Sequence, residues 1–351
     1  MNADPSPCLF APAASRAWAQ DVAAALGVAL QPLEEREFED GEHKSRPLVE
    51  VRGRDVYLLY SLHGDADRSA GDKLCRLLFL IGCLRDAAAA RVTAVVPYLA
   101  FARKDRRTQP QDPVNTRYVA ALFEAVGVDR VMTLDVHNLA AFENAFRRPT
   151  EHLEAAGLFV DFFAPRLDGR EGVVVSPDAG GLKRAEAFRK RLEAALGRPV
   201  GAAFAEKHRS LGVVSGELLA GEVAGRCAIV IDDLVSTGGT LARTARNCLG
   251  HGAAEVWAAA SHGLFTGEAA QALGDGSLAG LVVTDTVPPW RLPSGPARDR
   301  LQLLPTTGLF AQAIARVHGE FAPFTPAGHA TGTPPGASGP APGSGGSAGA
   351  S

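Results

Sequence analysis

The chain has 351 residues, of which 46% are hydrophobic and 21% are charged, and its formal net charge is −3. This length and composition are typical of a globular protein with two compact domains. The near-neutral charge argues against a large nucleic-acid-binding or membrane-binding surface. The sequence has no stretch of about 18 uncharged apolar residues, as a membrane span requires, and no secretory signal is recognisable.

The five cysteines fit neither a zinc site nor a disulfide framework. No two of them are spaced as CxxC, and no histidine lies at finger-like spacing from them. An odd count in a large core also argues against disulfide bonds. We therefore expect a protein of a reducing compartment, the cytoplasm.

Short apolar runs alternate with stretches in which apolar residues recur at helical spacing. Such alternation predicts βαβ units and a mainly parallel sheet. In chain order we expect strands at 55–61, 91–100, 129–137, 172–178, 199–204, 227–233, 255–261 and 278–285, and helices at 73–87, 113–127, 182–196, 238–250 and 308–320.

The alternation forms two series that are separated near residues 149–161, which predicts two α/β domains. We assign residues 8–155 to the first domain and 156–324 to the second, whose last helix can pack on the first. Residues 1–7 and 325–351 are expected to be disordered. The second of these segments is almost entirely Pro, Gly, Ala, Ser and Thr, a composition with too little apolar surface to offset the entropy of ordering.

The segment VIDDLVSTGGT, at 230–240, carries the strongest chemical signal. An apolar strand leads into Asp232 and Asp233, and a helix follows the hydroxyl- and glycine-rich loop. Ligands of parallel α/β sheets bind at the carboxyl ends of strands. Glycines and a helix N-terminus favour a phosphate, whereas the two acids can hold ribose hydroxyls or the water shell of Mg²⁺. The pattern therefore indicates a site for a phosphorylated sugar.

This segment resembles the phosphoribosyl-pyrophosphate signature that phosphoribosyltransferases share with ribose-phosphate pyrophosphokinases. The resemblance implies two phosphoribosyltransferase-like domains, each a mainly parallel sheet flanked by helices. It also implies a ribose 5-phosphate site. The residues are Arg209, Asp232, Asp233, Ser236, Thr237, Gly238, Gly239 and Thr240.

Other segments resemble ribose-phosphate pyrophosphokinases specifically. They are FEDGE at 38–42, PYLAFARKDRR at 97–107, TLDVH at 133–137, SPDAGG at 176–181 and EKHRS at 206–210. EKHRS follows a predicted strand and is similar to the family's mobile catalytic loop, which makes Lys207 and Arg209 the candidate catalytic residues. The resemblance implies that His137 and Asp178 engage Mg²⁺. It implies ATP contacts from Phe38, Asp40, Gly41, Glu42, Arg103, Lys104, Asp105 and His137, although the family usually has glutamine in place of Lys104.

The expected reaction is the Mg²⁺-dependent transfer of diphosphate from ATP to the 1-hydroxyl of ribose 5-phosphate. Two alternatives share part of the pattern: a phosphoribosyltransferase, and a non-catalytic subunit that associates with an active synthase. In the family the FEDGE-type loop completes the ATP site of a neighbouring subunit, so the resemblance also implies a homo-oligomer. After Ser61 and after His137 the chain departs from the family's usual pattern.

Overall fold

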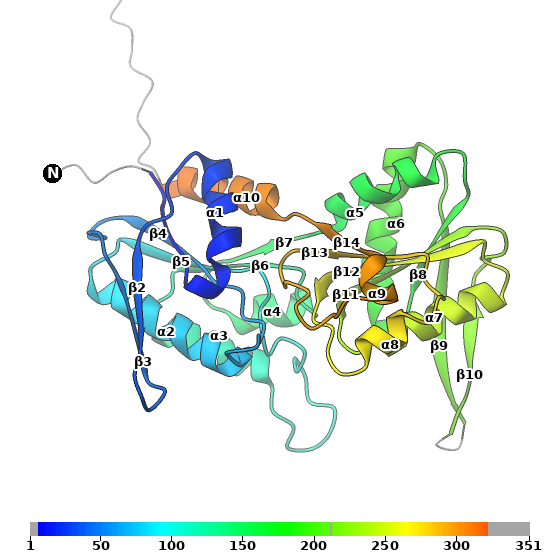
Figure 1. Ribbon diagram of the computed structural model, residues 1–351, viewed down its shortest axis with the longest axis horizontal. Helices are drawn as coiled ribbons and strands as arrows, with labels where there is room; N and C mark the ends of the chain where they lie inside the picture. Colours follow the sequence, from blue (N-terminus) through cyan, green and yellow to red (C-terminus); the bar gives the residue numbers. More distant parts are fainter. Residues whose placement is uncertain (1–5, 211–212, 322–351) are drawn as a thin grey trace, which may run out of the picture.

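The computed structural model describes residues 6–210 and 213–321 of the chain. The expectation of disorder at 325–351, and at 1–5 near the start, concerns segments outside the described residues. Two sheets lie next to one another along the molecule, each flanked by helices (Figure 1). The predicted fold class, two domains that each have a mainly parallel sheet between helices, is confirmed. Among the described residues, no helix is both long and apolar enough to cross a membrane.

The N-terminal sheet has five strands, all parallel to their neighbours. Their spatial order is β1 (Cys8–Phe10), β4 (Asp55–Leu59), β5 (Arg91–Val96), β6 (Arg130–Leu134) and β7 (Thr150–Leu153). Strand β5 ends earlier than expected, because Pro97 has no N–H with which to continue the ladder. Four helices belong to this half: α1 (Arg16–Leu26), α2 (Ala70–Asp86), α3 (Asn115–Ala125) and α4 (Leu139–Ala145).

The C-terminal sheet has seven strands, and only β10 runs antiparallel to its neighbour. In spatial order they are β10 (Val213–Ala220), β9 (Gly201–Ser210), β8 (Gly172–Ser176), β11 (Cys227–Val235), β12 (Glu255–Gly263), β13 (Gly280–Thr284) and β14 (Leu301–Leu304). The helices of this half are α5 (Ala156–Phe163), α6 (Leu182–Leu196), α7 (Gly239–Gly250), α8 (Ala269–Leu273) and α9 (Pro296–Asp299).

The buried faces of the sheets follow the period-two alternation of strand side chains. Tyr57 and Leu59 of β4 belong to one core cluster, and Val56 and Leu58 belong to another on the opposite face. The first cluster continues across both sheets, beneath the helices α1, α10 (Thr307–Phe321), α5 and α6 on the upper side in Figure 1. One hydrophobic layer therefore joins the two halves.

The last helix, α10, returns to the N-terminal half and packs beside α1 (Figure 1). The Trp18 ring meets Phe310 of α10 edge-on, with ring centroids 5.1 Å apart. The Trp18 Nε1–H also donates to Thr306 Oγ1 at 3.1 Å, just before the helix. The chain thus crosses between the two sheets twice, which limits how far the halves can separate.

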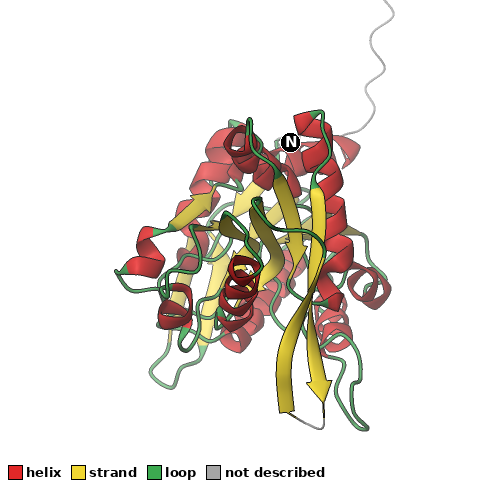
Figure 2. Cartoon of the chain, turned by 90° about the vertical axis from the view of Figure 1, so that its right-hand side faces the viewer, coloured by secondary structure: helices red, strands yellow, loops and turns green. Residues whose placement is uncertain are grey.

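Two hairpins stand out: β2 (Leu33–Glu37) with β3 (His43–Pro47) is a separate two-stranded sheet, and β9–β10 belongs to the C-terminal sheet. The turn between β2 and β3 carries FEDGE. The second hairpin, β9 with β10, corrects an expectation: EKHRS does not form a loop after a strand but is the second half of β9 (Figure 2). The backbone of Lys207 pairs with Glu217 and that of Arg209 with Val214. Strand β9 extends because β10 supplies backbone donors and acceptors along it, with a shift of register between Val214 and Glu217, and local sequence does not reveal this partner.

Candidate functional site

The carboxyl ends of strands from both sheets converge on one cavity of about 310 Å³. Arg103 follows β5 and His137 follows β6, whereas Asp178 follows β8. The C-terminal sheet adds Asp232, Asp233, Leu234, Val235, Ser236, Thr237, Gly238, Thr240 and Leu241. The cavity therefore brings together residues that are distant in the sequence: Arg103 and Leu241 are 138 positions apart.

The loop between β11 and α7 requires glycine at its last position. Gly238 has a φ of +74°, and a Cβ there would lie 2.6 Å from Cγ of Leu273. Both the backbone conformation and the contact exclude a side chain. The Ser236 hydroxyl lies 2.9 Å from Thr266 Oγ1, which ties the loop to its neighbour. The first turn of α7 consequently faces the cavity with free backbone N–H groups, the arrangement that binds a phosphate at a helix N-terminus.

The two acids at the end of β11 share one cation, Arg184 of α6. Its Nη1 lies 3.2 Å from Asp232 Oδ1 and 3.4 Å from Asp233 Oδ1. Burial, together with the neighbouring Asp233, raises the pKa of Asp232. Burial also opposes ionisation of Asp233, but the hydrogen bond with His137 and the charge of Arg184 hold its pKa below the usual range. Two adjacent carboxyls in such different environments differ in their affinity for a proton.

Sequence reasoning missed Arg184. It lies in the first turn of α6, three residues beyond Gly181, where the SPDAGG segment ends. A cation at that position is placed near the carboxyl ends of β8 and β11, because α6 starts directly after β8. The position of Arg184 in the first turn of the helix was the only sign in the sequence that it belongs to the site. Its two partners at the end of β11 could not be predicted from the sequence.

His137 and Asp178 both keep one atom available for a ligand. His137 Nδ1 is 2.7 Å from Asp233 Oδ2, and its Nε2 has no hydrogen-bond partner among the described residues. That hydrogen bond, against the effect of burial, raises the pKa of His137. Asp178 accepts the Gly181 N–H at 3.0 Å through Oδ1. Its Oδ2 has no partner within the part of the chain that the structure describes.

His137 and Asp178 fit a metal ion whose remaining coordination positions are filled by the substrate. A metal-binding histidine commonly makes a hydrogen bond to a carboxylate through its second nitrogen, as His137 does with Asp233. The described residues contain no group of three or more His, Cys, Asp or Glu side chains arranged to hold a metal. Mg²⁺ is commonly held by one or two carboxylates together with substrate phosphates and water, so a full protein cage is not required.

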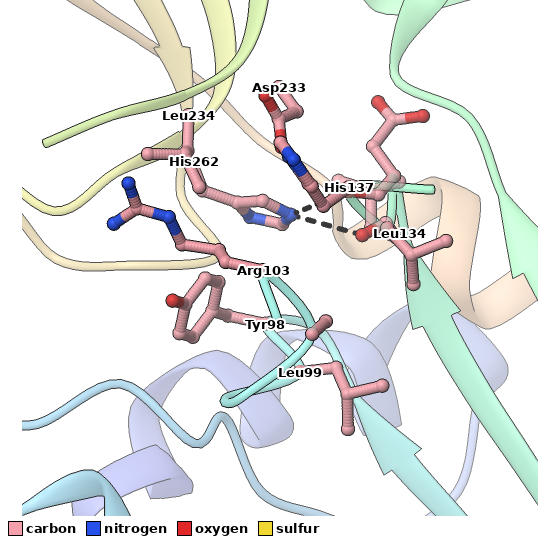
Figure 3. A pocket seen from close by; sticks show the side chains of 11 residues that line it. Tyr98, Leu99, Arg103, Leu134, His137, Asp233, Leu234 and His262 are labelled. Atoms are coloured by element: carbon pink, nitrogen blue, oxygen red, sulfur yellow. Dashed lines mark hydrogen bonds and ion pairs between the residues drawn. The ribbon is translucent and has the colours of Figure 1, made fainter. Parts of the chain in front are cut away.

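A much smaller cavity, of about 10 Å³, lies beside His137 between the two halves (Figure 3). His262 Nε2 of β12 lies 3.0 Å from the Leu134 carbonyl oxygen, which accepts a hydrogen bond, and the His262 ring meets Tyr98 edge-on with ring centroids 5.1 Å apart. Burial lowers the pKa of His262. A neutral His262 whose Nε2 carries the proton can therefore donate to the end of β6, and it fixes the strand that precedes His137. Sequence reasoning did not single out this histidine.

Several predicted site residues lie elsewhere. FEDGE forms the exposed turn of the β2–β3 hairpin, which projects from the N-terminal half in Figure 1, and none of its residues lines either cavity. Phe38 lies under the Arg36 guanidinium, with 4.7 Å between the ring centroid and Cζ.

Lys104 and Asp105 have partners near their own loop. Lys104 pairs with Asp112, and Asp105 accepts a hydrogen bond from Asn138 Nδ2 at 2.6 Å. The side chains of Lys207 and Arg209 lie outside the described set.

Three comparisons relate this chain to known proteins. A family model for the N-terminal domain of ribose phosphate pyrophosphokinase matches residues 8–127, and one for a phosphoribosyl synthetase-associated domain matches residues 211–322. Ribose-phosphate pyrophosphokinases from Caldanaerobacter subterraneus and Gloeobacter violaceus are 35% and 36% identical to it, over 86% and 88% of this chain and 91% and 90% of theirs. A crystal structure of phosphoribosylpyrophosphate synthetase from Mycobacterium smegmatis superposes with a TM-score of 0.80 at 31% identity, covering 90% of this chain and 99% of that one.

Proposed function

This chain belongs to the ribose-phosphate pyrophosphokinase family, and we propose that it transfers diphosphate from ATP to ribose 5-phosphate. The 1-hydroxyl of the sugar attacks the β-phosphorus of ATP, and AMP leaves. One observation supports this proposal: the hydroxyl- and glycine-rich loop after β11 lines the same cavity as a second set of side chains, Arg103, His137 and Asp178. A site for a single phosphorylated sugar would not need the second set.

We assign ribose 5-phosphate to the C-terminal side of the cavity. We propose that backbone and hydroxyl donors from Ser236, Thr237, Gly238, Gly239 and Thr240 bind the 5-phosphate at the start of α7, a proposal supported by the presence of all but Gly239 in the cavity lining. Asp232 and Asp233 can accept hydrogen bonds from ribose hydroxyls, with Arg184 neutralising part of their charge. We include Arg209 among the sugar-phosphate contacts on the resemblance alone.

We assign the ATP phosphates to the N-terminal side. Arg103 lines both cavities and can form a bidentate contact with phosphate oxygens. His137 and Asp178 would hold Mg²⁺, which neutralises charge on the phosphate oxygens when bound. Lys104 and Asp105 follow Arg103 in the same loop, and we include them in the nucleotide site on the resemblance alone.

Catalysis then consists of positioning and charge neutralisation, as in other phosphoryl transfers. Lys207 and Arg209 are proposed to stabilise the charge that develops on the transferring group. Both lie in the hairpin formed by β9 and β10, whose base is anchored in the C-terminal sheet. The chemistry needs no covalent bond between the enzyme and the substrate.

We further propose a homo-oligomer in which FEDGE completes the ATP site of a neighbouring copy. This proposal is supported by the position of the β2–β3 turn, whose exposed Asp40, Gly41 and Glu42 line neither cavity of their own chain. The odd number of cysteines, none spaced as CxxC, fits a reducing compartment, and we propose that the enzyme acts in the cytoplasm.

The reaction is tested by measuring AMP formation from ATP with and without ribose 5-phosphate. We expect formation that depends on both the sugar phosphate and Mg²⁺. A phosphoribosyltransferase would instead release pyrophosphate from phosphoribosyl pyrophosphate when a nucleobase is supplied. A non-catalytic subunit would show neither activity alone, and either result would overturn the proposal.

The shared site is tested by mixing two variants that are inactive singly, Phe38→Ala and Lys207→Ala. Subunit exchange creates some sites with both residues intact, so activity should partly return. The control mixes each variant with a second preparation of itself. No recovery in a mixture shown to exchange subunits would contradict the sharing of sites.

A further inference from the structure

The loop that follows β5 is closed on itself by a charged pair. It runs from Pro97 to Val114, and within it the Lys104 ammonium forms a hydrogen-bonded ion pair with the Asp112 carboxylate. The side chains are 31% and 24% exposed, so solvent screens this pair less than it screens one on an open surface. Lys104 Nζ also donates to Thr108 Oγ1 at 3.1 Å.

Asp112 is the centre of this arrangement. Its Oδ2 also accepts from the backbone N–H groups of Thr108 and Gln109, each at 2.9 Å, and from Thr108 Oγ1 at 2.7 Å. The hydrogen bonds from Lys104 and Thr108 hold the pKa of the Asp112 carboxyl well below its usual range. Asp112 is therefore a stable anion at neutral pH, and the ammonium of Lys104 has a partner within its own loop.

Arg103, before Lys104, faces the site, and Asp105, after it, contacts the segment that follows His137. Arg103 lines both cavities. Asp105 accepts from Asn138 Nδ2 at 2.6 Å, and Asn138 is the residue after His137. The Lys104 carbonyl also lies 3.4 Å from the Thr116 N–H, at the start of α3. Contacts on three sides thus fix the short segment from Arg103 to Asp105 against the end of β6 and the start of α3.

We propose that Lys104 and Asp112 form a clasp that positions Arg103 for the ATP phosphates, so that Lys104 acts through the loop and not by direct contact with the nucleotide. This inference rests on the proposed function, because it assigns ATP to the N-terminal side of the cavity. It also gives a role to the lysine at a position where the family usually has glutamine. Lys104 and Asp112 are positioning residues, and Arg103 is the residue that meets the substrate.

Direct contact of Lys104 with ATP and the clasp predict different effects of removing the Asp112 carboxylate. If Lys104 contacted ATP directly, Asp112 would only compete for its ammonium, and removing the carboxylate would leave ATP binding unchanged or tighter. If the two form a clasp, removing either partner frees the loop, and removing the second has little further effect. Such non-additivity between contacting residues is what a double-mutant cycle measures.

The experiment compares Lys104→Met, Asp112→Asn and the double variant with the unaltered enzyme. The asparagine keeps an oxygen for the N–H groups of Thr108 and Gln109 but removes the charge that holds Lys104. Each single change is expected to raise the KM for ATP about fivefold, with the KM for ribose 5-phosphate unchanged and the double variant no worse than either single one. A normal or lower KM for ATP in Asp112→Asn, or multiplication of the two effects in the double variant, would overturn the clasp.

A matched control is Lys190→Met. Lys190 pairs with Glu186 on α6 at 3.5 Å, is 69% exposed and lines neither cavity. This variant also loses one lysine from an ion pair, and we expect unchanged KM values for both substrates. An equal rise in its KM for ATP would mean that lost charge, and not the loop, explains the result.

A second measurement does not depend on activity. Trypsin can cut after the exposed Arg106 and Arg107 once the loop loosens, and the cleavage rate can be followed in the ligand-free protein. Both clasp variants should be cut several times faster at these bonds than the unaltered protein or Lys190→Met. Unchanged cleavage in both would overturn the clasp even if AMP formation is never observed, whereas faster cleavage without any AMP formation would contradict only the proposed reaction.

Discussion

The two loops that meet at the cavity are held in place by different means. The loop from Ser236 to Gly238 is short, joins a buried strand directly to α7, and packs against Leu273. The loop from Pro97 to Val114 is long: its start is packed in the core through Leu99 and Ala102, whereas the part from Arg103 onward is largely exposed and held by polar contacts that centre on Asp112. Close packing tolerates little change of shape, whereas exposed polar contacts contribute modestly to global stability.

This difference predicts where substitutions should act. Changes in the packed loop should lower the free energy of unfolding as well as sugar-phosphate binding. Changes in the exposed loop should alter nucleotide binding while the melting temperature stays nearly constant. Under the proposed assignment, the loop for ribose 5-phosphate is built into the fold, whereas the loop for ATP depends on a segment that is held locally.

The largest effect should come from residues that belong to neither loop. Lys207→Ala and Arg209→Ala should each reduce kcat about a hundredfold, because one charge contact in the transition state contributes about 3 kcal/mol. Steady-state AMP formation measures the loss, and circular dichroism checks that the fold is kept. Turnover near that of the unaltered enzyme in both variants would remove the β9–β10 hairpin from the mechanism.

The packed loop is tested by Gly238→Ala. An added Cβ would meet Leu273 and would have to adopt a φ of +74°, so the free energy of unfolding should fall by about 2 kcal/mol. Gly239→Ala is the matched control, because its Cβ would have only one neighbour within 4 Å, at 3.8 Å from Thr237 Oγ1. Urea denaturation of both variants measures the difference. Equal stabilities would show that the loop can shift at little cost.

His137 and Asp178 connect the two sides, and their loss should affect nucleotide use more than sugar binding. His137→Ala and Asp178→Ala should raise the KM for Mg-ATP about tenfold, the effect of losing one charge-assisted contact of about 1.4 kcal/mol. The KM for ribose 5-phosphate should change much less. An unaltered dependence of the rate on Mg²⁺ concentration in both variants would contradict their assignment to the metal.

The smallest effect should follow deletion of the chain after Thr325. The deleted segment has a composition without core-forming residues, so neither kcat nor the melting temperature should change. A differential scan of the two proteins under the same buffer conditions measures this. A fall of several degrees would mean that the segment packs on one of the two domains.

The sequence by itself determined the α/β class, most strands and helices, and the chemistry of the loop that follows β11. Helix α6 was predicted at 182–196 and is observed at Leu182–Leu196, because apolar spacing and the flanking glycines are local signals. The order of Asp232, Asp233 and the hydroxyl–glycine loop is likewise legible in one short segment. Such features depend on residues that are near neighbours in the chain.

Only the tertiary structure decided which distant groups meet. Strand β9 extends through Lys207 and Arg209 because β10 pairs with it, and Arg184 reaches Asp232 because α6 starts beside β11. His262 supports the end of β6 across 128 positions of sequence, and FEDGE forms a turn that lines neither cavity of its own chain. The first two contacts arise within the C-terminal half and the third arises where the two sheets meet, and no local period in the sequence encodes the partner.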